Sequence, residues 1–179
     1  MIAEMKKSVF QYNDRMKRFI LGILLKVDYL RDIEQDAIHD ILYNLKTERF
    51  SRGHILQKPG DNADTLFFLV DGVIEIYTTI EDADEFVIER LFRGSVINYR
   101  TFCMPDDGKV FYRFGRNSIC ATLHFDKFEE IYMKHPSLKK KFTKFRRSII
   151  TEDKPFPLDY IMNLPKHLRN EKVDLKTQN

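Results

Sequence analysis

The residues that could do chemistry are scattered along this chain and form no recognisable catalytic motif. The carboxylate pairs Asp106–Asp107 and Glu129–Glu130 belong to a turn and to the start of a helix. No nucleophile elbow, P-loop or glycine-rich dinucleotide turn occurs in the sequence. The histidines lack the spacing to cysteines or carboxylates that a metal site needs; they are His39, His54, His124, His135 and His167. We therefore expect no enzymatic activity, no catalytic residue and no metal ligand.

A basic stretch near the end of the chain is a candidate surface for binding an acidic partner. Residues 139–147 are rich in lysine and arginine and lie opposite an apolar stripe of helical spacing, formed by Leu138, Phe142, Phe145 and Ile149. This pattern predicts the solvated face of a helix, with contact to acidic lipid, nucleic acid or an acidic partner as the alternative. The net charge of +3 over 179 residues argues against a dedicated nucleic-acid binder.

The cysteines and the start of the chain indicate a reducing environment. Cys103 and Cys120 both lie among apolar neighbours, and we expect them to be reduced thiols in the core. Met1–Lys7 lacks the apolar region of a signal peptide, and no apolar run approaches the roughly 20 residues of a membrane span. We expect the chain to be cytoplasmic, either alone or at the cytoplasmic face of a membrane protein.

The elements that must position any site begin with two helices. The first has apolar residues at steps of three and four, namely Met5, Val9, Tyr12, Met16, Phe19, Ile20, Ile23 and Val27. Asp32 is the predicted N-cap of the second, with Gln35 as its capping-box partner and an apolar stripe from Ile38 to Leu45.

From Thr47 the period of the sequence changes to that of short strands. The predicted strands are Thr47–Phe50, His54–Lys58, Thr65–Val70, Val73–Thr79, Phe86–Phe92, Val110–Phe114 and Ser118–Phe125. Asp71–Gly72 between two apolar runs predicts a type I′ hairpin turn, in which both residues have positive φ. We expect Gly94 to Gly108 to be mostly irregular or briefly helical. These strands predict a small β-roll or barrel.

Helices return after the last strand. Asp126 with Glu129 forms a predicted cap and capping box, and His135–Pro136 separates this helix from the basic one. The chain then carries Pro155, Pro157 and Pro165 and ends in a polar tail.

This order of elements, with its glycines, resembles the cyclic nucleotide-binding domain family from about Leu30 to Ile150. That family includes kinase regulatory subunits, gated cation channels and bacterial catabolite-activator-type proteins. The matching features are Gly53 before Ile55, the Gly60–Asp61 turn, the run from Phe67 to Glu75 around Gly72, Gly94–Ser95, and Cys120–Leu123 before Phe128. The helix-turn-helix of the bacterial members has no counterpart here, so we expect no contact with DNA.

The resemblance also implies a ligand site, from which this sequence departs. The family holds a cyclic phosphate with backbone amides and an arginine, and the ribose with a glutamate. The candidate ligand residues are Gly94, Ser95, Ile97, Asn98, Tyr99, Lys109 and Val110. Asn98 replaces the family's glycine, Tyr99 its glutamate and Val110 its arginine. Lys109, Arg100 and Arg113 are the cations that remain near a phosphate.

We therefore predict an α+β fold, a β-roll of about eight short strands flanked by N-terminal and C-terminal helices. The predicted organisation is a helical leader (1–29), a cyclic-nucleotide-binding-like domain (30–151) and a C-terminal arm and tail (152–179). The preferred function is a scaffold whose cavity is empty or filled by Tyr99 or Phe111. The alternative is a sensor for cAMP or cGMP, in a cation channel or a kinase.

A scaffold of this kind would have no resident cofactor. Its expected partners are proteins or further copies of the chain, bound by the N-terminal helices and the arm. Membrane contact is expected only indirectly, through a parent protein.

Overall fold

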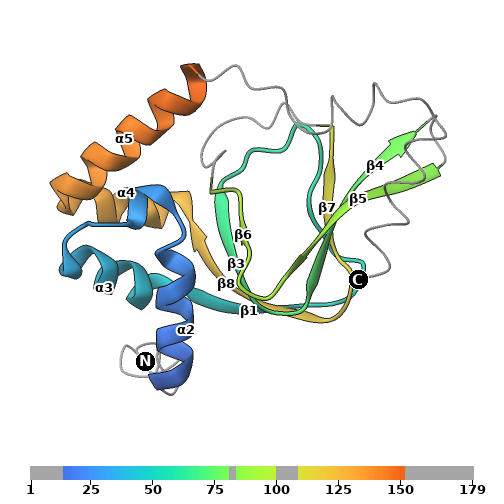
Figure 1. Cartoon of the computed structure of the whole chain (residues 1–179), viewed down its shortest axis with the longest axis horizontal. Helices are drawn as coiled ribbons and strands as arrows, with labels where there is room; N and C mark the ends of the chain where they lie inside the picture. Colours follow the sequence, from blue (N-terminus) through green and yellow to red (C-terminus); the bar gives the residue numbers. More distant parts are fainter. Residues whose placement is uncertain (1–13, 81–83, 100–108, 152–179) are drawn as a thin grey trace.

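The structure, a computed structural model, describes residues 14–80, 84–99 and 109–151 (Figure 1). Its helices are α2 (Asp14–Leu24), the short 3₁₀ helix η1 (Asp28–Leu30), α3 (Gln35–Asn44), α4 (Phe125–Lys134) and α5 (Pro136–Thr151). Its strands are β1 (Lys46–Phe50), β2 (Ile55–Gln57), β3 (Thr65–Asp71), β4 (Val73–Ile80), β5 (Asp84–Phe92), β6 (Val96–Ile97), β7 (Phe111–Phe114) and β8 (Ser118–His124).

The strands form two four-stranded antiparallel sheets that face each other as a roll. One sheet has the order β1-β8-β3-β6 and the other the order β2-β7-β4-β5. The helices gather on the outer side of the first sheet, at one end of the molecule (Figure 1). The predicted α+β roll with flanking helices is therefore confirmed. The sequence did not predict β6, which lies in the segment expected to be irregular.

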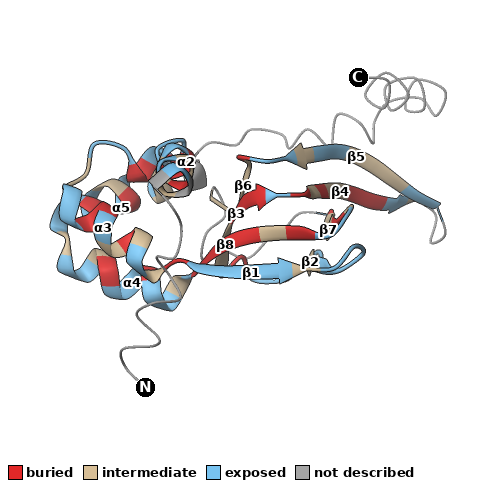
Figure 2. Cartoon of the chain, turned by 90° about the horizontal axis from the view of Figure 1, so that it is seen from below, coloured by how far each residue is buried: buried red, intermediate tan, exposed pale blue. Residues whose placement is uncertain are grey.

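The two middle strands of the first sheet, β8 and β3, are buried on both faces, and their register determines which residues face the helices and which face the roll interior. Leu66 lies opposite Leu123 and Phe68 opposite Ala121, and all four belong to the core cluster shared with the helices. Leu69 alternates with them and belongs, with Ile97, Ile74, Phe114 and Cys120, to a second cluster inside the roll. Figure 2 shows the resulting buried residues along β3 and β8.

The turn at Asp71–Gly72 is a corner between the two sheets, so the predicted type I′ hairpin is wrong. β3 pairs with β6 and β8, whereas β4 pairs with β5 and β7. Only Gly72 has a positive φ, of 123°, because a chain that passes from one sheet to the other needs no paired two-residue turn. A hairpin and a corner both favour glycine, which is why the sequence does not separate them.

Two predicted helix caps are also wrong. Asp32 has a left-handed φ of 55° and lies before the helix, whose N-cap is Glu34 without a side-chain cap bond. At α4 the N-cap is His124, and its Nδ1 accepts a hydrogen bond from the backbone N–H of Asp126 at 3.3 Å. β8 ends at His124 and α4 begins at Phe125, two residues earlier than a cap at Asp126 would place it, so an imidazole takes the place expected for Asp126.

Other predictions for the helices are confirmed among the described residues. Ile20, Ile23 and Val27 are buried against the roll. α4 ends at Lys134 and α5 begins at Pro136, where the missing N–H costs no helix bond. The apolar stripe of the basic helix is buried or partly buried at Leu138, Phe142 and Phe145. The N-terminal residues 1–13 and the arm at 152–179 lie outside the described residues.

Cys120 is buried as predicted, and Cys103 lies outside the described residues. Burial, and secondarily the carboxylate of Glu48, raise the pKa of the Cys120 thiol to about 12. It is therefore an apolar core group and not a reactive thiol. In the described part of the chain, no helix is long and apolar enough to cross a bilayer.

Replacing Gly72 with alanine tests the corner between the sheets. A Cβ at this position would lie 1.9 Å from Ser118 Oγ and 2.8 Å from Ser118 Cα, on a backbone with φ +123°. Overpacking and left-handed strain together are expected to lower the free energy of unfolding by about 2–4 kcal/mol. Urea unfolding followed by circular dichroism measures the change.

Gly22→Ala is the matched control, because nothing lies within 4 Å of a Cβ at this exposed position in α2. The same glycine-to-alanine change is expected to raise stability there by about 0.5–1 kcal/mol. Equal effects of the two substitutions would contradict the corner geometry.

Candidate ligand-binding site

The candidate site begins at a corner that is tied to β3. The backbone N–H of Gly94 donates to the carbonyl of Leu69 at 2.8 Å, and the N–H of Leu69 donates to the carbonyl of Ser95 at 2.9 Å. Gly94 adopts a φ of 92°, a left-handed conformation that glycine accepts without strain. From the turn between α2 and η1, Lys26 Nζ donates to the Gly94 carbonyl at 3.1 Å. The corner is thus fixed from the sheet and from the helices.

Ile97 and Asn98 carry the chain from this corner into the roll. Ile97 lies opposite Phe67 of β3 and is 2% exposed, in the inner cluster. Asn98 has a φ of 70°, which asparagine tolerates better than most residues. Its Nδ2 donates to Gln57 Oε1 at 2.7 Å and to the Thr65 carbonyl at 3.0 Å. Asn98 therefore keeps the conformation of a glycine while its side chain joins β2 and β3.

Tyr99 faces the helices. Its side chain packs against the core cluster that the helices share with the first sheet, and its carbonyl accepts a hydrogen bond of 3.0 Å from the Tyr29 hydroxyl. Tyr29 is 1% exposed and lies against Phe142 and Phe145 of α5, at ring distances of 5.1 Å and 5.0 Å. Burial, and then the nearby Tyr99, raise the pKa of Tyr29 well above its ordinary value. The site is thereby bonded to the helical core.

Lys109 and Val110 lie directly before β7, a strand of the second sheet. Val110 is 1% exposed, so an apolar and uncharged side chain is buried at the position aligned with the family's arginine. Lys109 is exposed, and its carbonyl accepts a hydrogen bond from Thr78 Oγ1 at 2.9 Å. The residues between Tyr99 and Lys109, including Arg100, lie outside the described residues.

Arg113, one of the cations expected near a phosphate, has carboxylate partners in the second sheet. It donates to Glu75 at 3.2 Å and to Glu85 at 2.5 Å. Its guanidinium also lies 4.2 Å from the ring centroid of Tyr77. These carboxylates raise the pKa of Arg113 although desolvation by burial, the largest single effect, lowers it. A phosphate would compete with two carboxylates for this side chain.

The inner cluster of the roll contains other aromatic residues than the two predicted to fill a cavity. Neither Tyr99 nor Phe111 belongs to the inner cluster, and Phe111 stacks on Tyr77 at 5.0 Å. The aromatic side chains of the inner cluster and its partly buried neighbours are Phe50, Phe67, Tyr112 and Phe114. Phe50 and Phe114 stack nearly parallel, with ring centroids 4.5 Å apart.

The seven predicted site residues thus have different environments. Gly94, Ser95, Ile97 and Asn98 line one continuous path from the corner to β2 and β3. The sequence analysis missed Tyr29, which lies 70 residues from its partner and carries no motif. It also missed Gln57, a buried polar residue in a strand. The roles of the seven predicted residues in ligand binding stay a prediction.

Comparison with known proteins gives one family. The sequence model described as cyclic nucleotide-binding domain matches residues 47–135. No curated protein sequence matches the chain. Among solved structures, the N-terminal domain of a transcriptional regulator from Streptomyces coelicolor A3(2) has a TM-score of 0.61 and 15% identity, over 73% of this chain and 95% of that one. A cyclic nucleotide-binding domain from Methylobacillus flagellatus KT has a TM-score of 0.59 and 18% identity, over 76% and 78%.

A third similar structure is the regulatory domain of Toxoplasma gondii PKA in a co-crystal with cAMP. It has a TM-score of 0.56 and 15% identity, over 68% of this chain and 46% of that one. The chain also covers 43% of cAMP-bound PfPKA-R (141–441), so it spans less than half of both PKA structures. At these identities the structural likeness establishes the fold.

Tyr29→Phe tests the bond between the helices and the site. The variant keeps the ring but leaves the carbonyl of Tyr99 without its donor, and we expect a loss of about 1–2 kcal/mol of stability at pH 7. The raised pKa predicts how this loss depends on pH. The unfolded phenol ionises near pH 10 while the folded one stays neutral, so the wild-type advantage is complete below about pH 10 and shrinks above it.

Urea unfolding of both proteins between pH 7 and pH 10.5 measures these effects. Tyr43→Phe, at a 43% exposed tyrosine of α3, is the control and is expected to change stability by less than about 0.5 kcal/mol. A Tyr29→Phe variant as stable as the wild type would refute the role of this hydrogen bond.

Proposed function

Because residues 47–135 form a domain of the cyclic nucleotide-binding family, we propose that the chain is a non-enzymatic interaction module with a degenerate phosphate cassette. Domains of this family are regulatory rather than catalytic. The observation that carries the proposal is the environment of the two substituted anchor positions. Tyr99 packs against the helical core, and Val110 is a buried apolar residue.

The energetic consequence supports weak or absent binding of a cyclic nucleotide. A charge-assisted hydrogen bond contributes about 1.5–3 kcal/mol, and a free-energy change of about 1.4 kcal/mol changes affinity tenfold. Loss of a carboxylate at position 99 and a guanidinium at position 110 would therefore weaken binding about a hundredfold or more. Arg113 offers little compensation, because Glu75 and Glu85 hold it in the second sheet.

A scaffold role would use the helical part of the chain. We propose that protein partners, or further copies of the chain, bind through the N-terminal helices and the arm at 152–179. The scaffold keeps the roll as a rigid base, because the first sheet and the helices share one core cluster.

The second candidate is a sensor for cAMP or cGMP, and one contact favours it. The hydrogen bond from Tyr29 to the Tyr99 carbonyl joins the candidate site to η1, and Tyr29 also packs on α5. A ligand that displaced Tyr99 would disturb η1 and α5 together. Such coupling requires different ligand affinities of the two arrangements.

Thermal unfolding with cAMP and cGMP separates the two functions. Only a ligand that binds the native state raises the midpoint, and at a hundredfold excess over the dissociation constant it adds about 2.7 kcal/mol. In a chain of 179 residues that corresponds to a shift of about 5–11 °C. We expect a shift below about 1 °C with 1 mM of either nucleotide. This concentration is about a hundredfold above a dissociation constant of 10 μM, so binding with that affinity would be detected.

The Toxoplasma gondii PKA regulatory domain, which has been co-crystallised with cAMP, is the positive control, and 5′-AMP is the control for non-cyclic nucleotide. A clear shift of this chain with cAMP or cGMP, and none with 5′-AMP, would favour the sensor and reject the degenerate cassette.

A further inference from the structure

The corners of the roll lie together at its lower end and form one surface. The chain turns from one sheet to the other at residues 51–54, 71–73, 92–95 and 115–118 (Figure 1). Hydrogen bonds join these corners to one another: Arg52 N–H donates to Asn117 Oδ1 at 3.0 Å, and Gly115 N–H donates to the Val73 carbonyl at 2.8 Å. These bonds join three of the four corners, so side chains from segments that are distant in sequence lie on one surface.

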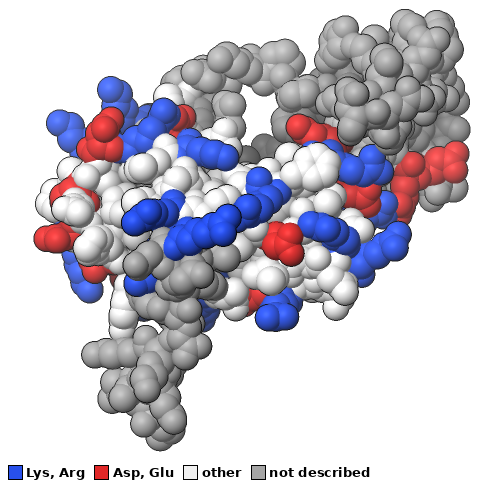
Figure 3. Space-filling model, turned by 60° about the horizontal axis from the view of Figure 1, so that its bottom comes forward, with Lys and Arg blue, Asp and Glu red and all other residues white. Residues whose placement is uncertain are grey.

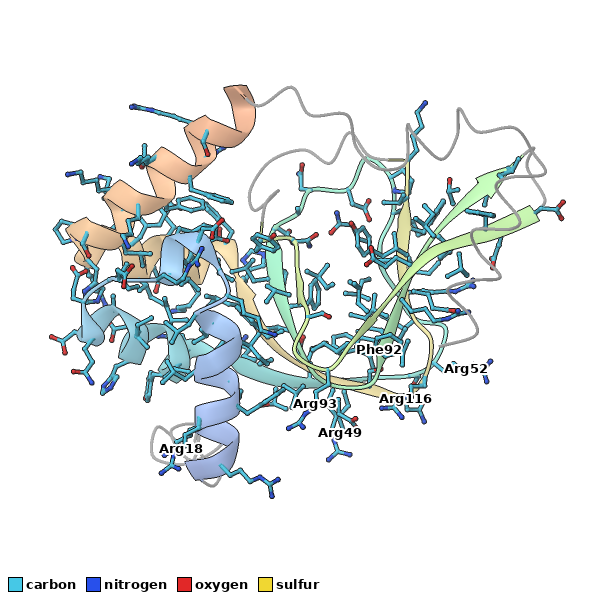
Figure 4. The ribbon with its side chains drawn as sticks, in the orientation of Figure 1. Arg18, Arg49, Arg52, Phe92, Arg93 and Arg116 are labelled. Atoms are coloured by element: carbon cyan, nitrogen blue, oxygen red, sulfur yellow. The ribbon has the colours of Figure 1, made fainter. Side chains whose placement is uncertain are left out.

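Exposed arginines gather on this surface. Three come from the corners, and two flank them on β1 and α2; together they are Arg18, Arg49, Arg52, Arg93 and Arg116. Figure 4 shows Arg49, Arg93 and Arg116 along the lower edge of the roll, between Arg18 of α2 and Arg52. Figure 3 shows a band of basic side chains across this face. We call these five arginines, together with Phe92, the arginine rim.

The rim is positively charged because few carboxylates compensate it. Within the four corner segments Asp71 is the one acidic residue, and it pairs with Arg116 at 3.1 Å. The ion pairs among the described residues do not include Arg18, Arg49 or Arg52. These three guanidinium groups can therefore bind an external anion without first breaking an ion pair in this part of the structure.

Phe92 adds an exposed apolar side chain to the rim, next to the charged side chain of Arg93. The Arg93 guanidinium lies 3.9 Å from the ring centroid of Phe19 in α2, and its Nε donates to the Val70 carbonyl at 3.2 Å. Phe92 precedes it at the end of β5 and is 58% exposed. A large exposed apolar side chain among cations is the combination found where proteins enter the interface of a lipid bilayer.

We propose that the arginine rim docks the chain on a membrane surface that contains anionic lipid headgroups, with Phe92 inserted among the lipids. The rim collects its charge from separate elements over a broad face, as a planar partner requires.

A pocket of 420 Å³ lined by Lys17, Asp40 and Tyr43 lies between α2 and α3 and is not part of the rim. The sequence predicts only indirect membrane contact. The rim residues come from segments that are far apart in the chain, and only the fold brings them together.

Two other anionic partners fit the rim less well. A single nucleic-acid strand is bound by rows of aromatic residues that stack on successive bases, and Phe92 is a lone exposed aromatic on the rim. An acidic peptide would use the arginines but would give Phe92 no apolar environment. Headgroup phosphates and acyl chains supply partners for both kinds of side chain.

Co-sedimentation of the whole chain with vesicles tests the proposal. We expect binding to phosphatidylcholine vesicles with 30% phosphatidylserine at 0.1 M salt, none to phosphatidylcholine alone, and a large loss at 0.5 M salt. Each neutralised arginine is expected to weaken binding roughly fivefold, so Arg49→Gln with Arg52→Gln gives roughly 25-fold. Phe92→Ala is expected to weaken it roughly tenfold.

Two matched variants control for charge and for exposed apolar area. Lys139→Gln with Lys140→Gln removes the same charge from the exposed face of α5, and Met133→Ala trims a side chain that is 61% exposed on α4. Both are expected to bind like the wild type. Unfolding midpoints of all variants show whether a loss of binding reflects a loss of fold.

Three results would overturn the proposal. The first is equal sedimentation with neutral and anionic vesicles, or with neither. The second is a loss in the α5 double variant as large as that in the rim double variant. The third is tighter binding of a fluorescent single-stranded 20-nucleotide DNA, or of a poly-glutamate peptide, than of anionic vesicles. Unchanged binding of Phe92→Ala would contradict the insertion of Phe92 among the lipids.

Discussion

The burial of two neighbouring strands, β3 and β8, on both faces is the constraint on which the rest of this structure depends. Along β3 and β8 successive residues alternate between the helical core and the roll interior, so Phe68 contacts the helices and Leu69 contacts Ile97 and Cys120. A shift of one residue in this register would exchange the two sets. Helices, sheet and roll are consequently parts of one packed unit. We expect a substitution on one face of β3 or β8 to affect the packing on the other face.

The candidate site inherits this constraint. β6 pairs with β3 at the edge of the first sheet, and of the residues after it Asn98 contacts the roll and Tyr99 the helical core. Asn98 is bonded to Gln57 and to β3, while Tyr99 is bonded and packed to the helical core. Side chains that would meet a ligand in the family are here part of the internal packing, which agrees with a scaffold.

The sequence predicts elements well because periodicity reports burial, and it predicts their connections less well. The helical stripe from Leu138 follows directly from which side is buried. In β4 the alternation is interrupted between Ile76 and Tyr77, where the register shifts and both Tyr77 and Thr78 are buried. The Asp71–Gly72 signal identified a turn but not its partner strands, since hairpin and corner need the same backbone freedom at Gly72.

Contacts between distant segments are invisible to local patterns. Tyr29 with Tyr99 and the arginine rim both arise from residues that only the fold brings together.

The Asn98–Tyr99 segment is bonded and packed within the protein, and we propose that it does not receive a cyclic nucleotide. Amide chemical shifts of a ¹⁵N-labelled chain, followed while cAMP is added to millimolar concentration, address this segment directly. The account predicts that the side-chain amide of Asn98 and the backbone amides of residues 96–99 keep their positions. Saturable shifts at these amides, with the rest of the roll unchanged, would contradict it.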